Sequence, residues 1–488
     1  MTSLPSTADI VIAGGGPAGA TIARLLAGLG FHVVVYEKRA FPRHQIGESL
    51  TPQVLPLLDF LGVRARIEAA GFLRMVGHTV CWGNAQPRTS YYSPDRSRQG
   101  LQVWRAEFDA LLLDHARAGG AAVYERQLVK DVRFHDAGVT VHTAHGHTDT
   151  SFFIDATGRA GVLARRELRQ RDPVFQTLAV SGYWQNASGP PGIDFANTIL
   201  ETYADGLVWS VPLHNGLRNV TFLVDWQLGV HIRRSGLSAF YRDQVVRIPY
   251  VASFLRQAHL VLGPQAFDAT WHTAARFAGE RFLLVGDAGM FVDPLSSEGV
   301  HKAMAAAITG AAVVNTILRR PTMTANAIQF YDESQRSTYE LHYRQSAGYY
   351  REEQRWPETP FWQRRGASNE FRVPSDEFRA PNTIVSRVAL VPGTAIATRP
   401  VIEGPFVELR EAMVTPRHPR GVRFLDHVCL PPLLRAVEQY GALDRIMRAY
   451  LETQEGRGCP PEAVRQVLAR LYQEGDLTTI APDESQSD

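Results

Sequence analysis

A chain of 488 residues is longer than one compact core usually holds, so we expect a large nucleotide-binding body with an added domain. Its formal net charge is only +2, which gives no support for nucleic acid or an anionic membrane as the main partner. The three cysteines are far apart and form no CxxC pair, which argues against a disulfide framework, a zinc site or a redox dithiol.

The first predicted elements form a β-α-β unit. An apolar, β-rich run over 9–12 ends at glycines, a helical run covers 18–29, and a second strand covers 31–36. The polar residues 1–8 and the glycines that interrupt the apolar run predict neither a signal peptide nor a membrane span, so we expect a cytoplasmic enzyme.

Later segments predict more strands and one buried helix. The alternating pattern of residues 197–224 is typical of a half-exposed sheet, which could form the floor of a substrate chamber. Strands are also predicted over 139–142, 152–156 and 281–285, and a helix over 297–318.

The composition changes after a long predicted helix over 327–354. Residues 358–420 are rich in Pro and Arg with little periodicity, whereas 430–451 and 461–477 predict short amphipathic helices. We therefore expect a catalytic body over 1–365 and a small, mainly helical C-terminal domain over 366–488, which could dock a substrate or partner. The polar segment 481–488 is predicted to be disordered.

Gly14, Gly16 and Gly19 form a GxGxxG motif between the first strand and the first helix. These glycines permit a tight turn, a close approach of backbone to a pyrophosphate, and close packing of helix on strand. Glu37 ends the second strand, where a carboxylate can accept hydrogen bonds from both ribose hydroxyls. Asp287 follows the apolar strand over 281–285 and could bind a ribityl chain or cap a helix.

Four motifs in order resemble the p-hydroxybenzoate hydroxylase-like flavoproteins: the glycine motif, Arg105 in VWRAEFDALL, the DATG segment over 155–158, and RFLLVGDAGMFVDPLSSEGVHKAM from residue 281. The resemblance implies FAD as cofactor and an α/β fold with a Rossmann-like FAD domain, into which an antiparallel substrate sheet is inserted. The residues expected to bind FAD are Gly14, Gly16, Pro17, Ala18, Gly19, Glu37, Lys38, Glu48, Ser49, Arg105, Gly158, Asp287, Pro294, Gly299 and Val300.

Three further segments, FPRHQIGESL from residue 41, GFLRMVGHTVCWG from residue 71 and PFWQRRG from residue 360, resemble the flavin-dependent halogenases. The chain departs from that family at Met75, where the family has a catalytic lysine, and at Leu207, where the family has the first Trp of WxWxIP. Glu298 stands where close halogenases have a small residue, and a carboxylate there opposes halide by like charge.

These departures predict an FAD-dependent monooxygenase that hydroxylates an indole- or phenol-type substrate through a flavin hydroperoxide. The candidate catalytic residues are Glu298, as a base or a helix cap, His301, as a packing residue or a base, and Trp209. One alternative is a halogenase that has relocated its lysine, with Lys130 or Lys302 as candidates. Another is an ene reductase similar to geranylgeranyl reductases, which PLSSEGV also resembles, and a third is a flavin-binding assembly partner without turnover.

The expected partners follow from the same resemblance. The substrate would be an aromatic group, free or presented on a peptide or carrier protein, as in the halogenase-like hydroxylases that mature quinone-cofactor amine dehydrogenases. Reduced flavin would come from NAD(P)H or a separate flavin reductase. Aromatic residues predicted near the substrate sheet could line a pocket or belong to the core: Trp82, Tyr183, Trp184, Trp209 and Trp226.

Overall fold

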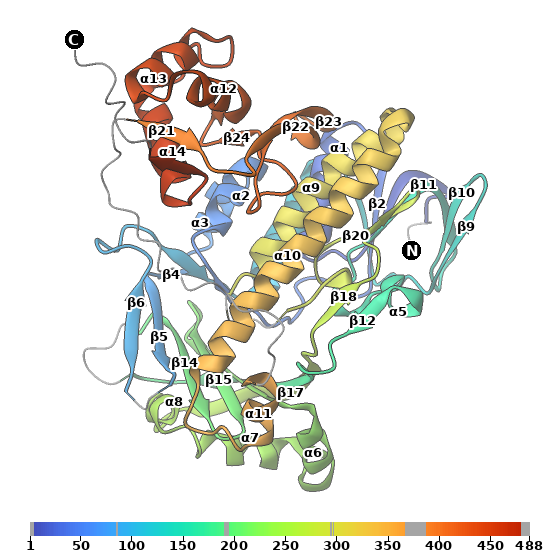
Figure 1. Ribbon diagram of the computed structural model, residues 1–488. Helices are drawn as coiled ribbons and strands as arrows, with labels where there is room; N and C mark the ends of the chain where they lie inside the picture. The colour runs from blue at the N-terminus through green and yellow to red at the C-terminus, as the bar shows by residue number, and fades with distance from the viewer. Residues whose placement is uncertain are drawn as a thin grey trace. The chain divides into compact units, whose positions relative to one another are not determined.

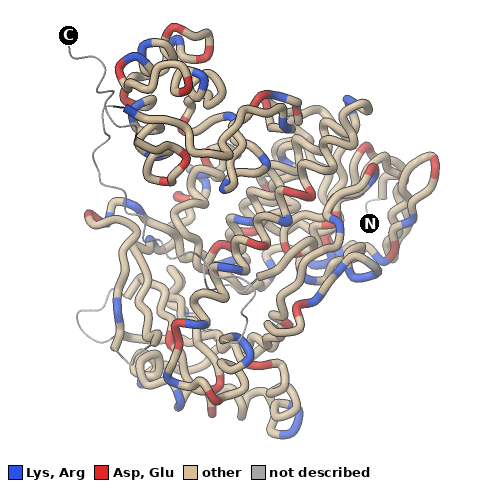
Figure 2. Tube along the Cα trace, in the orientation of Figure 1, with Lys and Arg blue, Asp and Glu red and all other residues tan. Residues whose placement is uncertain are grey.

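The computed structural model describes residues 4–83, 86–189, 195–292, 295, 297–366 and 387–479. The chain folds into two compact units, one made of residues 1–318 and 334–373 and the other of residues 319–333 and 374–488 (Figure 1). Basic and acidic residues are interspersed along the elements of each unit (Figure 2).

The predicted β-α-β unit starts the first sheet. Strand β1 (Thr7–Ala13) pairs in parallel with β2 (Val33–Glu37), and helix α1 (Pro17–Gly28) connects the two strands. The strand order is β19-β20-β11-β1-β2-β8, with β10 and β9 added beside β11. The remaining strands are β8 (Ala122–Glu125), β9 (Asp131–His135), β10 (Gly138–His142), β11 (His147–Asp155), β19 (Ala278–Gly279) and β20 (Phe282–Leu284). The Rossmann-like fold class is confirmed.

A second sheet follows the order β17-β13-β16-β15-β14-β5-β6. Its neighbours are antiparallel except for β14 and β5, which are parallel. This is the predicted inserted substrate sheet. Its strands are β5 (Gly77–Cys81), β6 (Arg88–Tyr91), β13 (Thr177–Gln185), β14 (Thr198–Tyr203), β15 (Gly206–Pro212), β16 (Leu217–Asp225) and β17 (His259–Asp268).

The two faces of the second sheet serve different cores. One face, which includes Val220 and Phe222, packs on helices α7 (Leu237–Val245) and α8 (Pro249–Phe254). Residues of the other face, Trp209 and Leu223 among them, belong to an aromatic cluster with helix α11 (Pro360–Gly366). Because successive side chains of a strand point to opposite faces, each strand contributes residues to both cores.

Helices and short strands complete the first unit. They are α2 (Val54–Leu61), α3 (Arg64–Ala69), α4 (Arg105–Ala118), α5 (Ala164–Glu167), α6 (Gly229–Ser235), α9 (Gly299–Arg319), and strands β3 (Ser49–Leu50), β4 (Leu73–Met75), β7 (Gly100–Gln102), β12 (Arg169–Arg171) and β18 (His272–Ala274). Helix α9 is long and apolar enough to cross a membrane, but 78% of its apolar window is buried inside the protein, as in the core helix of a globular unit. The long helix α10 (Thr324–Glu352) follows it.

The second unit combines a helical core with small sheets. Helices α12 (Leu430–Tyr440), α13 (Leu443–Glu452) and α14 (Pro461–Gln473) bury their apolar faces together. The segment predicted as a helix over 430–451 is broken at Gly441, whose φ of +63° ends α12. Its strands are β21 (Val388–Leu390), β22 (Ala395–Glu403), β23 (Phe406–Val414), β24 (Phe424–Leu425), β25 (Val428–Cys429) and β26 (Leu477–Thr479).

The hairpin of β22 and β23 was not predicted, because the sequence over 358–420 lacks clear periodicity. The two strands pair from Ala395 with Val414 to Glu403 with Phe406. Most of their side chains are exposed or half-buried, so no buried face imposes a regular alternation on their sequence. The predicted disorder of residues 481–488 lies outside the described residues.

Candidate active site

A cavity of about 900 Å³ lies in the first unit, where it is lined by residues from both sheets. Ala13, Glu37, Ala156 and Val285 are in its wall, and these residues end or directly follow parallel strands of the first sheet. Ligands of open α/β sheets bind at the carboxyl ends of the strands. The volume is in the range of small-molecule sites.

The glycine turn at this cavity fits a pyrophosphate. Gly14 has a φ of +101°, and a Cβ there would lie 2.3 Å from the carbonyl oxygen of Ala156. A Cβ on Gly19 would lie 1.9 Å from the carbonyl oxygen of Gly14, so Gly19 serves helix packing and does not line the cavity. No side chain caps the start of α1, and Gly16 to Ala18 face the cavity with the helix N-terminus.

Glu37 lies at the cavity wall with a fixed orientation. Its Oε2 accepts a hydrogen bond of 2.8 Å from the Gly15 amide, and its Oε1 accepts one of 3.0 Å from the Arg39 amide. Lys38 and Lys130 line the same cavity. This arrangement is the one expected of a carboxylate that binds a ribose beside the pyrophosphate turn.

Arg105, at the start of α4, orders the loop that leads into Glu48. Its guanidinium forms a paired contact with Asp109, with Nε 2.8 Å from Oδ1. Its Nη1 donates to the carbonyl oxygen of Ile46 at 2.8 Å. The predicted flavin-contacting arginine therefore lines the cavity and also fixes the backbone of the IGES segment.

Glu48 is a fully buried carboxyl group in the cavity wall. The Tyr183 hydroxyl donates a hydrogen bond to its Oε1. Burial raises the pKa of Glu48, while the hydrogen bonds from Tyr183 and the Gly47 amide lower it. The ring of His44 meets Tyr183 edge-on at 5.2 Å between centroids, so an aromatic group covers this pair.

Asp287 lines the cavity at the end of the strand over 282–284, and its surroundings are ordered by two basic residues. Lys302 Nζ lies 3.4 Å from Asp287 Oδ1 and donates to the carbonyl oxygen of Met290 at 2.9 Å. His272 Nε2 lies 3.1 Å from the Asp287 carbonyl oxygen. Burial lowers the pKa of His272 to about 4, so this ring is neutral near pH 7.

The second sheet forms a part of the cavity wall that contains none of the residues expected to bind FAD. Trp209, Asn219, Thr221 and Leu223 line the cavity from β15 and β16. Thr221 Oγ1 donates to Asn219 Oδ1 at 2.8 Å, and both side chains contact the Ser181 hydroxyl. A polar strip is therefore fixed between apolar and aromatic surfaces. Of the three predicted catalytic residues, Trp209 lies in this wall.

Met75 is fully buried and does not line the cavity. Its sulfur lies among polar groups, 3.1 Å from Gln102 Nε2, 3.2 Å from Thr198 Oγ1 and 3.4 Å from Ser49 Oγ. Gln102 Oε1 is buried and has no hydrogen-bond partner among the described residues. Ser49 does line the cavity, so the thioether lies one side chain behind the wall.

Glu298 and His301 do not line the cavity, although both lie at the start of α9. Glu298 Oε2 is 3.6 Å from Nδ1 of His342, a residue of α10 that the sequence did not single out. The Glu298 carbonyl oxygen accepts from the Lys302 amide, which is the backbone role of a helix cap. Burial raises the pKa of Glu298 and lowers that of His301.

Of the remaining residues that were predicted to bind FAD, Gly158, Gly299 and Val300 line the cavity, whereas Pro294 lies outside the described residues.

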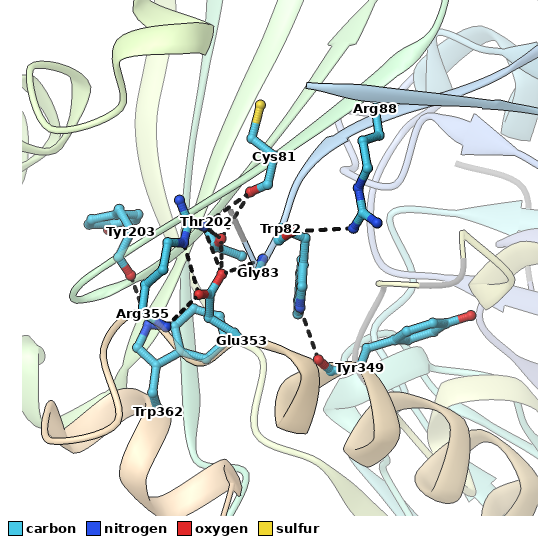
Figure 3. A network of polar contacts seen from close by, with 10 residues as sticks. All are labelled: Cys81, Trp82, Gly83, Arg88, Thr202, Tyr203, Tyr349, Glu353, Arg355 and Trp362. Atoms are coloured by element: carbon cyan, nitrogen blue, oxygen red, sulfur yellow. Dashed lines mark hydrogen bonds and ion pairs between the residues drawn. The ribbon is translucent and has the colours of Figure 1, made fainter. Parts of the chain in front are cut away.

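Most of the predicted aromatic residues lie outside the cavity wall, some in the core and one at the surface. Trp82 and Trp184 do not line the cavity, and Trp226 is 45% exposed. Trp82 donates from Nε1 to the carbonyl oxygen of Tyr349 at 3.0 Å (Figure 3). Because these tryptophans pack in the core or lie at the surface, aromatic content alone did not locate the cavity.

A buried polar network joins the end of α10 to the second sheet (Figure 3). Glu353 accepts hydrogen bonds from the Gly83 amide at 2.9 Å and from the side chains of Thr202 and Arg355. Its carboxylate is completely buried, and the hydrogen bonds lower its pKa to about 2 in spite of burial. This network fixes strands β5 and β14 against the helix.

Several cavity residues were missed by the sequence analysis: Arg43, His44, Arg159, Asn219, Thr221, Gln265, Phe267 and Phe291. The signal for Asn219 and Thr221 was present, because these two polar residues alternate with the apolar Val220 and Phe222 along the strand. Arg159 directly follows the DATG segment, and its guanidinium lies 5.1 Å from the Phe291 ring centroid. No local pattern links residues this far apart in the chain.

The family model described as "FAD binding domain" matches residues 7–319. A tryptophan 2-halogenase from Chondromyces crocatus is 34% identical over 67% of this chain and 65% of its own length. The flavin-dependent halogenase armH4 from Armillaria mellea is 33% identical over 68% of this chain and 69% of its own length. The chain thus spans about two thirds of the length of these curated relatives.

Two solved structures are similar over nearly the whole chain. The flavin-dependent halogenase CmlS has a TM-score of 0.81 at 25% identity, with 99% of this chain and 97% of that chain covered. The peptidyl tryptophan dihydroxylase QhpG, essential for tryptophylquinone cofactor biogenesis, has a TM-score of 0.70 at 27% identity, with 96% and 99% covered.

By their names, these relatives support the halogenase alternative better than the predicted hydroxylase. The open N-terminus of α1, the glycine turn and the cavity wall fit FAD. The chain therefore belongs to the FAD-binding family that includes the flavin-dependent halogenases, and FAD is its cofactor.

Proposed function

We propose that this enzyme uses reduced FAD and O2 to hydroxylate an electron-rich aromatic group. The observation that carries the proposal is the position of Met75 and of the three lysines in relation to the cavity. A thioether has no N–H, so Met75 cannot form a haloamine or donate a hydrogen bond to hypohalous acid.

The lysines of the sequence are Lys38, Lys130 and Lys302, and the surroundings of each favour another role. Lys38 and Lys130 lie at the cavity wall with Glu37, on the side expected for the ribose. Lys302 is buried and is held by Asp287 and the Met290 carbonyl oxygen. Relocation of the halogenase lysine to one of these positions is therefore disfavoured.

When bound, FAD supplies the two electrons and the activation of O2 that hydroxylation requires. The aromatic carbon would gain one oxygen atom of O2 in place of hydrogen, and the other oxygen atom would leave as water. In this proposal Trp209 and Phe267 stack on the substrate and Leu223 helps to exclude water, whereas Asn219 and Thr221 orient the polar edge of the substrate.

The proposed substrate is an indole or phenol side chain on a peptide or carrier. Its support is the similarity to QhpG, which acts on peptidyl tryptophan and matches this chain along 96% of its length. Reduced FAD is proposed to come from NAD(P)H or a separate reductase.

Halogenation is the second candidate, because most of the reported relatives are halogenases. The two candidates differ in their products. The enzyme, supplied with reduced FAD and ¹⁸O2, would be incubated with indoles, phenols and tryptophan-containing peptides, with and without bromide. Products that carry ¹⁸O and do not depend on bromide are expected in mass spectra. Bromide-dependent brominated products without ¹⁸O would overturn hydroxylation in favour of halogenation.

A further inference from the structure

The second unit contains a cluster of titratable side chains that the active site does not use. His418 lies in the loop between β23 and β24, Glu474 directly follows α14, and Asp476 directly precedes β26. One ligand atom from each residue lies within 4.8 Å of the other two. His418 Nε2 is 3.7 Å from Asp476 Oδ2 and 3.9 Å from Glu474 Oε2.

Asp476 is the observation that points to a ligand. Its side chain is only 4% exposed, and its Oδ2, which faces His418, has no hydrogen-bond partner among the described residues. A buried carboxylate oxygen without a donor is costly, unless a cation compensates for the lost water.

The other two groups are oriented by neighbours that leave one ligand atom available on each. Arg470 Nε donates to Glu474 Oε1 at 2.7 Å, so Oε2 is the oxygen that remains for the cluster. The His418 amide donates to Thr415 Oγ1 at 3.0 Å, which fixes the turn that carries the imidazole. Such supporting hydrogen bonds are usual around metal ligands.

We propose that His418, Glu474 and Asp476 bind one divalent transition-metal ion, for which Zn²⁺ is the probe. One imidazole nitrogen and two carboxylate oxygens form a ligand set that suits Zn²⁺, with a fourth position for water. Zn–N and Zn–O bonds of about 2.0–2.2 Å separate ligands at a tetrahedral centre by roughly 3.4 Å. The two separations from His418, 3.7 and 3.9 Å, need only a small contraction, and all three ligand atoms lie within 4.8 Å of one another.

The ion would connect two parts of the second unit that are distant in sequence. It would tie the loop after the β22–β23 hairpin to the turn between α14 and β26. Cysteine spacing predicted no metal site, but this ligand set contains no cysteine. The competing explanation is a His418 imidazolium between two carboxylates, with Arg417 as a further positive charge near Asp476.

Zinc binding distinguishes these explanations. The full-length, FAD-loaded protein, freed of any affinity tag, would be treated with EDTA, dialysed and titrated with ZnCl2 by calorimetry. One Zn²⁺ per chain is expected, with a rise in Tm. His418→Asn and Asp476→Asn are each expected to weaken the affinity by more than roughly tenfold, because loss of even an outer-shell partner costs 10–100-fold.

His427→Asn is the matched control. His427 is exposed in the same unit, and its φ of +70° suits Asn, so this variant should bind Zn²⁺ like the wild type. Thermal unfolding in EDTA would establish that the half-exposed His418 position tolerates Asn. Equal zinc affinity and equal Tm shifts in the wild type and His418→Asn would overturn the proposal, as would a wild type that binds no Zn²⁺.

Discussion

The hydroxyl of Tyr183, a residue of the second sheet, donates a hydrogen bond to the buried carboxyl group of Glu48 in the wall of the FAD cavity. This contact joins the second sheet, through β13, to the loop that precedes β3 at the site. It also supplies Glu48 with a donor that its buried position needs, because water does not reach it.

Replacement of Tyr183 by Phe is expected to destabilise the folded protein by about 1–3 kcal/mol, since it leaves a buried acceptor without its donor. The Glu48 pKa should rise further, because the hydrogen bond that lowers it is lost. Chemical unfolding over a range of pH would measure both effects, because a shifted pKa appears in the pH dependence of the unfolding free energy. Tyr250→Phe is the control, as the Tyr250 hydroxyl has no hydrogen-bond partner among the described residues and its loss should change stability little.

The Met75→Lys variant tests whether the absence of a lysine at this position favours hydroxylation over halogenation. Ser49 Oγ and Thr198 Oγ1 lie 3.4 and 3.2 Å from the Met75 sulfur and can accept hydrogen bonds from an ammonium group, so we expect the variant to fold. In the presence of bromide it should form brominated product that the wild type lacks. Met75→Leu, which supplies no N–H, should keep the wild-type products. Bromination by the Leu variant would refute the role assigned to this position.

Gly14→Ala is expected to abolish FAD binding, because its Cβ would lie 2.3 Å from the Ala156 carbonyl oxygen in the turn at the helix N-terminus. Gly30→Ala is the control, because it introduces backbone strain at a positive φ without a steric clash. Gly30 has a φ of +86°, but a Cβ there meets nothing within 4 Å. The Gly30 variant should bind FAD normally and lose about 1 kcal/mol of stability. Flavin absorbance of the purified variants is the measurement.

Glu353→Gln should destabilise the first unit by about 1–3 kcal/mol at pH 7, because the Glu353 carboxylate accepts several buried hydrogen bonds. Glu358→Gln, at an exposed position nearby, is the control and should have almost no effect. Thermal unfolding of both variants beside the wild type would measure these differences.

The effect of Glu353 should depend on pH. Folding lowers its pKa from 4.5 to about 2, so the folded state holds the carboxylate charged. Its stabilisation is complete above the unfolded pKa near 4.5 and is lost as the pH falls toward 2. The stability difference between wild type and Glu353→Gln should therefore narrow over this interval. A difference that stays constant from pH 7 to pH 3 would contradict the charged state.

The nucleotide half of the site was predictable because its constraints are local. Gly14, Gly16 and Glu37 lie within one β-α-β unit, in which the φ of Gly14 requires a glycine and Glu37 accepts a hydrogen bond from the Gly15 amide. The second sheet was also recognised, since alternation marks a sheet with two different faces.

The rest of the cavity wall was predictable only in part because it is assembled from distant segments. Arg159, Gln265 and Phe291 lie on separate elements, and only the folded chain brings them to one cavity. Glu298 was selected from its place in a motif, but the motif does not fix the direction of its side chain toward His342. The hairpin over 395–414 escaped prediction because its strands bury few apolar side chains.

The alternation along β16 limits how the specificity of this enzyme can change. Asn219 and Thr221 face the cavity, whereas Val220 and Phe222 face α7 and α8. Deletion of one residue within the strand would exchange these faces, placing amide and hydroxyl groups in the helical core and aliphatic and phenyl groups against the ligand. New substrate preferences should therefore arise by point substitution inside β16, while changes of length are restricted to the turn at 214–216 that precedes it.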